Sequence, residues 1–271
     1  MDTLFSLAGK TAVITGGMGQ LGIEYASSFF ERGAFVSLID ISDKPKAYSS
    51  SFEQGLKSGR IKAYKADITD KKSIEHSAAA IISDAGVPHI LINNAALDSP
   101  PDAPVSEVGP FEAYPEESFD KVMDVNVKGT FLCSQIFGGH MALQGRGSII
   151  NISSIYGMLS PCQDIYEYRR KAGEVFFKPV AYSVSKSGIS NLTRYLATYW
   201  AKKGVRVNTL TLAGVFNKQP QGFLDAYCAR MPMGRMANAD EYVGAVVFLA
   251  SDASSYMTGS NLVIDGGWSA W

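Results

Sequence analysis

The sequence has little of what would tie it to a metal, a membrane or a nucleic acid. Its 271 residues include only three cysteines and three histidines, scattered along the chain, so we predict no metal site and a reducing, cytoplasmic environment. A formal net charge of −1 provides no basic surplus for a nucleic acid or an anionic membrane. No apolar run reaches the roughly 18 residues of a membrane helix. The first residues have no basic stretch and no long apolar stretch, so we expect no secretory signal.

Glycine is plentiful, with 26 residues, and the chain has a regular alternation of patterns. Short β-branched runs, mostly apolar throughout, alternate with longer amphipathic stretches, which is typical of parallel strands covered by helices on both faces. We predict one α/β domain over residues 1–271, with a doubly wound, parallel, seven-stranded sheet of Rossmann type. The predicted strands are 11–15, 35–40, 61–67, 90–94, 148–153, 205–212 and 261–265, and the predicted helices are 21–32, 71–85, 116–143, 181–203 and 240–251.

Two segments interrupt this alternation. Residues 98–114 contain four prolines and are predicted to be a loop, since proline disfavours both helix interiors and inner strands. Residues 160–179 are polar and aromatic and come directly after a predicted strand. Loops at the carboxyl ends of the strands of an open α/β sheet line its ligand crevice. Each segment is therefore either a plain surface loop or part of a substrate pocket.

A glycine-rich turn follows the first predicted strand and begins at Gly16. Gly16 would permit the tight turn, Gly19 would let the main chain approach a pyrophosphate, and Gly22 would allow close helix packing. Asp40 ends the second predicted strand 18 residues after Gly22. A carboxylate there accepts hydrogen bonds from both hydroxyls of an adenosine ribose and repels a 2′-phosphate. Alone, the turn could be interpreted as a tight strand–helix connection, and Asp40 as an acidic loop residue. Together, the two features favour the binding of NAD over NADP.

A tyrosine and a lysine stand four residues apart in the sequence Tyr182-Ser183-Val184-Ser185-Lys186, on one face of a predicted helix. A free phenol titrates near 10, and a nearby cation lowers that value. The pair therefore suits proton exchange with a carbinol oxygen. Such pairs are usually solvated surface groups. Tyr166 and Tyr168 have no lysine four positions on.

These motifs, in this order, resemble those of the short, single-domain members of the short-chain dehydrogenase/reductase family over nearly the whole chain. The C-terminal Asp265-Gly266-Gly267 is similar to the family's usual ending. The resemblance implies a catalytic set of Asn126, Ser154, Tyr182 and Lys186. It implies dinucleotide contacts from Gly16, Gly17, Met18, Gly19, Leu21, Asp40, Ile41, Asp67, Ile68, Asn94, Ala95, Ala96, Tyr182, Lys186, Gly214, Val215 and Phe216.

The resemblance also implies a role for each catalytic side chain. Tyr182 would exchange the alcohol proton while hydride passes to or from the nicotinamide. Lys186 would lower the pKa of Tyr182 and hold the nicotinamide ribose. Ser154 would polarise the carbonyl. Asn126 would kink its helix and hold a water molecule that links Lys186 to solvent.

Several features depart from the family pattern. Gln20 replaces a glycine of the turn, and Ala96 and Ala213 replace a glycine and a proline. Ser154 and Tyr182 lie 28 residues apart, which is more than usual, and the surplus forms an inserted segment at about 161–180. A substrate lid is expected at about 217–235. Its apolar residues at helical spacing, which also suit core packing, are Phe223, Tyr227 and Met231.

The family resemblance further implies a homotetramer or a homodimer. Helices 116–143 and 181–203 would form one interface, and the aromatic tail with Trp268 and Trp271 is a candidate for another. No nucleic-acid or membrane partner is expected.

The inserted segment guides the interpretation of the substrate. It carries both signs of charge and two tyrosines, which suits a polyhydroxylated or anionic small molecule. Its surroundings are similar to those in family members of bacterial surface-glycan sugar pathways. We therefore predict hydride transfer between a secondary alcohol and a ketone of a sugar or sugar-derived substrate. The candidate substrate contacts are Ser154, Tyr156, Tyr166, Arg169 and Arg170.

Other possibilities remain open at the level of sequence. One is a carbonyl or 3-oxoacyl-type reductase with an apolar substrate. Another is a non-catalytic dinucleotide-binding protein, and a third is a structural subunit of a complex. The inserted segment itself is either a pocket wall, a surface loop or an oligomer contact.

Overall fold

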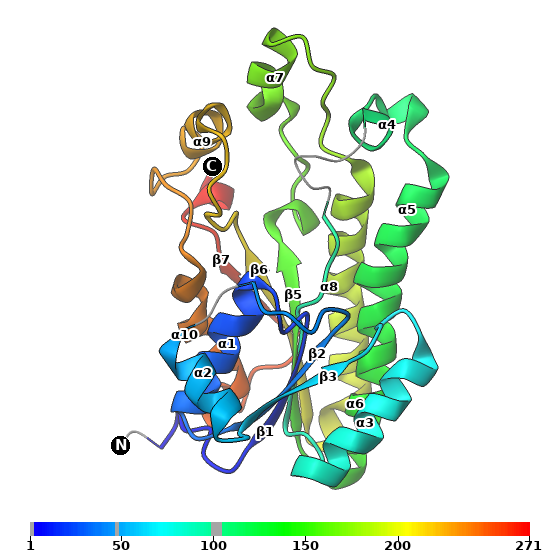
Figure 1. Ribbon diagram of the computed structural model, residues 1–271, viewed down its shortest axis with the longest axis vertical. Helices are drawn as coiled ribbons and strands as arrows, with labels where there is room; N and C mark the ends of the chain where they lie inside the picture. The colour runs from blue at the N-terminus through cyan, green and yellow to red at the C-terminus, as the bar shows by residue number, and fades with distance from the viewer. Residues whose placement is uncertain (1–2, 47–48, 99–104) are drawn as a thin grey trace.

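The computed structural model describes residues 3–46, 49–98 and 105–271. Over these residues, seven parallel strands form one sheet in the order β3-β2-β1-β4-β5-β6-β7 (Figure 1). The chain starts in the middle, winds outward to β3 and returns through β4 to β7, which confirms the doubly wound Rossmann prediction. The strands are β1 (Thr11–Thr15), β2 (Phe35–Asp40), β3 (Ile61–Lys65), β4 (Ile90–Asn93), β5 (Gly147–Ser154), β6 (Val205–Leu212) and β7 (Asn261–Ile264).

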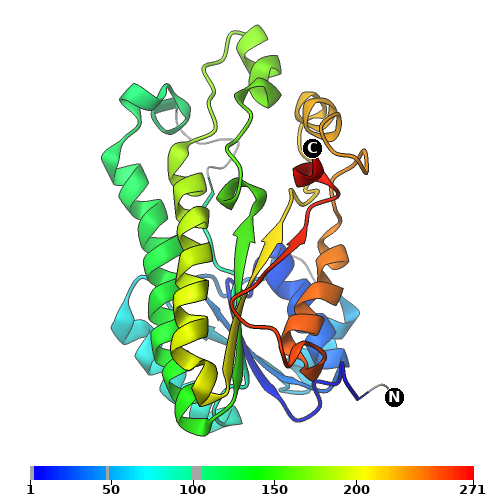
Figure 2. The same ribbon diagram turned by 180° about the vertical axis from the view of Figure 1, so that it is seen from behind.

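Helices cover both faces of the sheet (Figures 1 and 2). Strand β1 shows why its run is apolar throughout: Ala12 and Ile14 enter the core on one side, and Val13 enters the core on the other. The first core is covered by α1 (Gln20–Glu31), α2 (Ser50–Lys57) and α10 (Val243–Ala250). The second is covered by α3 (Lys71–Ala85), α6 (Thr130–Gln144) and α8 (Val180–Trp200).

The helix predicted over 116–143 is interrupted. It consists of α5 (Glu116–Met123), a π-helical turn (Asp124–Gly129) and α6. Single π-turns inside helices occur frequently at functional sites. This turn contains Asn126, as the expectation of a local kink requires.

Short elements lie over the carboxyl ends of the strands (Figures 1 and 2). One of them, Gln221–Cys228, falls in the expected lid, where the apolar residues stand at helical spacing, and the others were not predicted as helices. Several of them contribute to a third apolar cluster, which includes Tyr156, Tyr166 and Tyr227. A one-turn helix lies within the segment predicted to be a loop, while residues 99–104 of that segment are outside the described residues. These elements are α4 (Val105–Val108), α7 (Glu167–Lys171), α9 (Gln221–Cys228) and 3-10 helices at Phe111–Ala113, Ile155–Gly157 and Gln163–Tyr166.

The C-terminal tail packs within the chain. Trp268 is 8% exposed, and its ring stacks on Tyr227 with the centroids 4.6 Å apart. The expectation that Trp268 serves an oligomer interface is therefore wrong, because the third apolar cluster already buries its ring. Trp271 is exposed.

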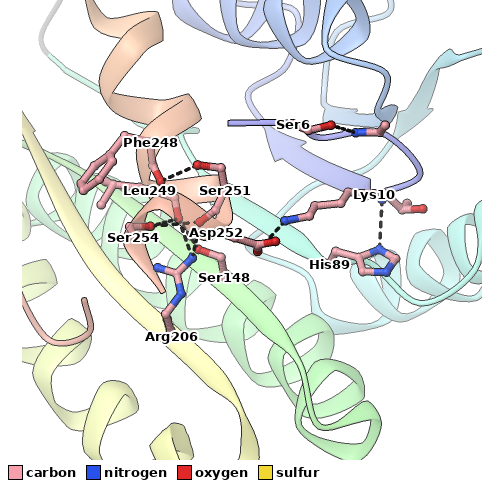
Figure 3. Close-up of polar contacts among 12 residues, drawn as sticks. Ser6, Lys10, His89, Ser148, Arg206, Phe248, Leu249, Ser251, Asp252 and Ser254 are labelled. Atoms are coloured by element: carbon pink, nitrogen blue, oxygen red, sulfur yellow. Dashed lines mark hydrogen bonds and ion pairs between the residues drawn. The ribbon is translucent and has the colours of Figure 1, made fainter. Parts of the chain in front are cut away.

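The opposite end of the sheet holds a dense polar network (Figure 3). The Arg206 guanidinium donates to the main-chain oxygens of Leu249 at 2.9 Å, Ser251 at 3.2 Å and Met257 at 3.3 Å. The Ser148 and Ser254 hydroxyls also donate to the Leu249 oxygen, at 2.7 and 3.1 Å. Together these donors satisfy carbonyls that the end of α10 leaves without helical partners.

Across the described part of the chain, no helix combines the length and apolar character needed to cross a membrane. Within the same residues, no group of three or more histidine, cysteine, aspartate or glutamate side chains is placed to hold a metal ion.

Candidate active site

The glycine-rich turn leaves its main chain uncovered at the start of α1. Gly16 has a φ of +62°, and a Cβ there would lie 2.8 Å from the Ala95 Cα. A Cβ on Gly22 would lie 2.5 Å from the Gly16 oxygen, so the helix and the turn pack with no room for side chains. Gly19 is the N-cap of α1, and no described side chain caps this end. The first N–H groups of α1 are thus available to an anion, as a pyrophosphate site requires.

Asp40 lies at the end of β2, against the same turn. Its Oδ2 accepts from the Met18 N–H at 2.9 Å, and its Oδ1 accepts from the Ser42 N–H at 3.0 Å. Each oxygen retains a lone pair for a ribose hydroxyl. The Lys46 N–H donates to the Met18 oxygen at 3.0 Å, so the main chain of a second lysine near Asp40, besides Lys44, adjoins this turn.

The neighbouring strand ends complete the dinucleotide crevice. The Asn94 amide donates to the main-chain oxygens of Thr15 and Gly16, both at 3.1 Å, and so fixes the end of β4 to the end of β1. Ala213, in place of the family's proline, donates its N–H to the Ile264 oxygen at 3.2 Å and extends the pairing of β6 with β7. A proline there could not make this bond.

The other predicted dinucleotide residues occupy more varied positions. Asp67 lies beyond the end of β3, which is two residues shorter than predicted, and its Oδ1 accepts from the Thr69 N–H at 2.8 Å. Ile68 is buried, whereas Ile41 and Phe216 are exposed. The main-chain oxygen of Phe216 accepts from the Gln20 side chain at 3.0 Å. Gln20, a departure from the family pattern, therefore ties the turn to the segment after β6.

Asn126 connects three elements of the site. Its Oδ1 accepts from the Leu97 N–H at 2.7 Å, and its Nδ2 donates to the Leu97 oxygen and to the Ser185 Oγ, both at 2.9 Å. The side chain thereby joins the π-helical turn to the chain after β4 and to α8, which carries Tyr182 and Lys186. This is the geometry of a positioning residue; the water that the sequence reasoning assigns to Asn126 stays a prediction.

Ser154, Tyr182 and Lys186 meet at the carboxyl end of β5. The Lys186 Nζ is buried, donates to the Ile152 oxygen at 2.9 Å, and lies 5.7 Å from the centroid of the Tyr182 ring. Burial lowers the pKa of Lys186 to about 8, and the negative charge of Asp98 opposes that shift. The Ser154 hydroxyl accepts from the Tyr156 N–H at 3.2 Å, and it acts to lower the pKa of the Tyr182 phenol.

The pKa of Tyr182 differs from expectation in its direction. Burial raises it above the ordinary value of 10, and the charge of Asp98 adds to the rise, while the hydrogen bond from Ser154 opposes it. The pKa of Tyr182 thus lies above its ordinary value, and a lowering of it by Lys186 stays a prediction.

A cavity of about 320 Å³ surrounds these three side chains. This volume lies at the small end of the range for ligand pockets. Tyr156 and Tyr166 line the cavity, as predicted for substrate contacts, and so does Tyr227. Besides Tyr182 and Lys186, the predicted dinucleotide residues that line it are Leu21, Asn94, Ala96, Gly214 and Val215.

The two arginines predicted to contact substrate are not among the described residues that line this cavity. Arg169 pairs with Glu174 at 2.6 Å and lies over the Phe176 ring, 4.2 Å from its centroid. Arg170 pairs with Glu167 at 2.8 Å and donates to main-chain oxygens at 3.0 and 3.3 Å. We correct their assignment: both guanidinium groups are used to fold segment 161–180.

Sequence reasoning missed two charged cavity residues. Lys178 and Asp98 form an ion pair that lines the cavity, and the Lys178 Nζ lies 5.1 Å from the centroid of the Tyr182 ring. The only available signals were the position of Lys178 four residues before Tyr182 and that of Asp98 just after the Asn-Asn-Ala-Ala motif. Gln219, in the expected lid, also lines the cavity.

Comparison with known proteins agrees with this geometry. A family model described as enoyl-(acyl carrier protein) reductase matches residues 18–269. A short-chain dehydrogenase from Leptospira borgpetersenii, solved with bound NAD⁺, is 35% identical and superposes with a TM-score of 0.85, covering 99% of this chain and 96% of that one. The chain belongs to the short-chain dehydrogenase/reductase family.

Two further relatives indicate the range of this family. The D-threitol dehydrogenase of Mycolicibacterium smegmatis is 31% identical over 99% of this chain and 96% of its own length. A gluconate 5-dehydrogenase from Burkholderia cenocepacia, solved with NADP and tartrate, is 25% identical with a TM-score of 0.83, covering 99% of this chain and 98% of that one. The protein is an oxidoreductase that acts on a CH–OH group of a small molecule with a nicotinamide dinucleotide.

Proposed function

We propose that this protein interconverts a secondary alcohol and a ketone of a sugar or polyol, with NAD as the preferred cofactor. The observation that carries the proposal is the meeting of Ser154, Tyr182 and Lys186 in one cavity that also holds the Asp98–Lys178 ion pair. A dinucleotide bound along the strand ends would supply the hydride acceptor or donor. The names of relatives that act on threitol and gluconate support the substrate class.

Within this proposal, Tyr182 transfers the proton of the reacting hydroxyl. Ser154, which lines the same cavity as Tyr182, donates to the same oxygen. Lys186, whose pKa of about 8 leaves it mostly charged at neutral pH, stabilises the Tyr182 phenolate when the proton is lost. Asn126 fixes the helix that carries both groups through its bond to Ser185.

The choice of NAD rests on Asp40. Its carboxylate lies against the glycine-rich turn, where it can accept from ribose hydroxyls and repel a 2′-phosphate. The exposed residues Lys44 and Lys46 follow it, so the preference is a balance of charges rather than an exclusion of NADP.

The charged lining argues against the apolar alternative. An acyl or other apolar substrate would offer no hydrogen bond to the charged groups of Asp98 and Lys178 or to the buried Tyr156 hydroxyl. A polyhydroxylated molecule offers both donors and acceptors to the same groups. The predicted link to surface-glycan sugar pathways stays a prediction.

Exposed aromatic and aliphatic side chains on α6 and α8 support the proposed homotetramer or homodimer. Tyr195 and Tyr199 are 63% and 57% exposed, and their rings stack 6.1 Å apart. Phe131 and Leu143 on α6 are also exposed, beside the same surface. Exposed apolar patches of this kind often mark protein interfaces. Light scattering coupled to size exclusion tests this part of the proposal, which a monomer would contradict.

Cofactor reduction tests the main proposal. Wild-type protein would be assayed for NADH or NADPH formation with tetritols, pentitols and hexitols, with sugar acids, and with simple secondary alcohols. We expect the highest kcat/KM for a polyhydroxylated substrate with NAD. Turnover confined to apolar alcohols or acyl ketones would contradict the substrate class, and a higher kcat/KM with NADP would contradict the cofactor.

A further inference from the structure

The Asp98–Lys178 pair occupies an unusual position for an ion pair. Both residues line the catalytic cavity, and the Lys178 side chain is only 8% exposed, against 47% for that of Asp98. A buried ammonium is destabilising unless it is paired and hydrogen-bonded, so the carboxylate of Asp98 compensates the buried charge of Lys178. The pair lies beside the phenol of Tyr182, whose ring the Lys178 Nζ approaches to 5.1 Å.

Segment 161–180 is built to place Lys178 there. The Gln163 side chain holds the main chain of Lys178 on both sides: its Oε1 accepts from the Lys178 N–H at 2.9 Å, and its Nε2 donates to the Lys178 oxygen at 3.1 Å. Arg170 in turn donates to the Gln163 oxygen at 3.0 Å and to the Phe176 oxygen at 3.3 Å. Arg170 therefore acts on the cavity indirectly, by fixing the loop that carries Lys178.

The pair presents complementary groups within one small cavity. The ammonium of Lys178 has three donors, and the carboxylate of Asp98 accepts only, so together they can satisfy neighbouring hydroxyls that each donate and accept. Their charges sum to zero. A substrate carboxylate bound near Lys178 would be repelled by the negative charge of Asp98, whereas a neutral polyol would experience no such repulsion.

The phenols around the pair extend this polar surface. The buried Tyr156 hydroxyl has no hydrogen-bond partner within bonding geometry among the described residues. Its pKa is raised, first by burial and then by the nearby Tyr166, so at neutral pH it is a neutral donor and acceptor. Tyr156 and Lys178 also line an adjoining cavity of about 830 Å³, so they stand at the boundary between the reacting centre and further space.

We propose that Asp98 and Lys178 are specificity-determining residues that bind the hydroxyls next to the reacting carbon of a neutral polyol or ketose, and that Asp98 discriminates against sugar acids. The proposal rests on the proposed function, because it names the groups that select a substrate for that same reaction. Under this proposal, segment 161–180 contributes to substrate selection through Lys178 and not through its two arginines.

The test compares kcat/KM for D-threitol and D-arabinitol with those for gluconate and for 2-butanol, which has no further hydroxyl. We expect Lys178→Met to lower the ratio of polyol to 2-butanol efficiency about 10- to 100-fold, as loss of hydrogen bonds to a charged group does. Lys178→Arg should restore part of it. Asp98→Asn should raise the ratio of gluconate to polyol efficiency about tenfold.

Matched controls are Lys171→Met and Asp164→Asn, which alter exposed side chains of the same segment and should leave both ratios at wild-type values. NADH binding and thermal unfolding verify that each variant folds. If Lys178→Met lowers all substrates equally or none, or if Asp98→Asn leaves the gluconate ratio unchanged or lower, the inference is overturned. If the wild-type protein turns over no polyol at all while oxidising 2-butanol, the proposed function itself fails.

Discussion

The two ends of the sheet treat buried polar groups in opposite ways. At the amino end, the Arg206 guanidinium donates to three main-chain oxygens, and Lys10 pairs with Asp252 at 2.9 Å (Figure 3). At the carboxyl end, the Lys186 ammonium donates to one oxygen, and the Tyr156 hydroxyl has no partner within bonding geometry in the described part of the chain. Both ends bury charge, but the buried Tyr156 hydroxyl without a partner among the described residues lies at the carboxyl end.

The difference indicates what each end is for. Saturated hydrogen bonds stabilise the fold, because an unsatisfied buried donor or acceptor costs about 1–3 kcal/mol. Unused capacity beside a cavity is a cost that a bound ligand can offset. Variants at the amino end should therefore change stability more than catalysis, and variants at the carboxyl end should do the reverse.

The strongest test of this contrast is Tyr182→Phe. Removing the hydroxyl takes away the proton-transferring group, so we expect kcat to fall about 10²- to 10⁴-fold. NADH binding, followed by fluorescence titration, should stay within a few-fold of wild type. The matched control, Tyr168→Phe, alters a tyrosine of α7 outside the cavity lining and should retain full turnover. Retention of more than a tenth of wild-type kcat in Tyr182→Phe would refute the assignment.

Arg206→Met tests the amino end. The substitution leaves three main-chain oxygens without their guanidinium donor, and we expect a loss of about 2–4 kcal/mol in the free energy of unfolding. Urea unfolding measures the loss, and kcat of the folded protein should be unchanged. Arg194→Met, on the exposed face of α8, is the control and should be nearly neutral. A drop in kcat without loss of stability would break the division between the two ends.

Local sequence signals were sufficient for the sheet and the glycine-rich turn. Each of the seven strands overlaps its predicted run. The apolar signal is clearest for inner strands such as β1 and β4, which are buried throughout, whereas the edge strand β3 has exposed lysines. The conformation of Gly16 and the packing of Gly22 follow from the turn itself. Helix α2 was missed because it is short, and its start depends on one cap, the Ser49 hydroxyl accepting from the Phe52 N–H at 3.1 Å.

The charged part of the cavity depends on long-range contacts that composition cannot show. Guanidinium groups commonly bind anionic or polyhydroxylated substrates, which is why Arg169 and Arg170 were predicted to contact one. In the structure they instead form ion pairs and hydrogen bonds with Glu174, Glu167 and main-chain oxygens a few residues away. Lys178 reaches the cavity through Gln163 and pairs with Asp98, 80 residues away. No periodicity or motif in the sequence encodes that pairing.

Lys186→Met sharpens the comparison by separating stability from catalysis at one residue. The pKa of Lys186 is about 8 in the folded protein, below its ordinary value of 10.5. Between these values the unfolded chain holds more protons, so this residue makes stability rise with pH in that window, and its penalty is fully present below about 8. We expect Lys186→Met to be more stable than wild type by about 1–3 kcal/mol at pH 7, after the lost bond to Ile152 is counted.

The difference in unfolding free energy between the two proteins isolates Lys186, because the titrating groups that they share cancel. It should shrink as pH rises from 8 toward 10.5, since Lys186 then loses its charge in the folded protein. Turnover of Lys186→Met should fall at the same time. A variant less stable than wild type at pH 7, or a stability difference that does not change with pH, would show that burial of the Lys186 ammonium does not destabilise the folded protein.

The finest test concerns Asp40, whose two oxygens accept from Met18 and Ser42 and still have capacity left. Asp40→Asn keeps an oxygen for the Met18 N–H and removes the negative charge. Without repulsion of a 2′-phosphate, kcat/KM for NADP relative to NAD should rise about tenfold, which corresponds to ~1.4 kcal/mol. Initial rates with both cofactors measure the ratio, and Asp43→Asn, an exposed neighbour, is the matched control. If the ratio of kcat/KM for NADP to that for NAD is unchanged, Asp40 serves only to stabilise the turn, as Arg206 stabilises the end of α10. A tenfold rise would show that Asp40, although it accepts from two main-chain N–H groups, also interacts with the cofactor.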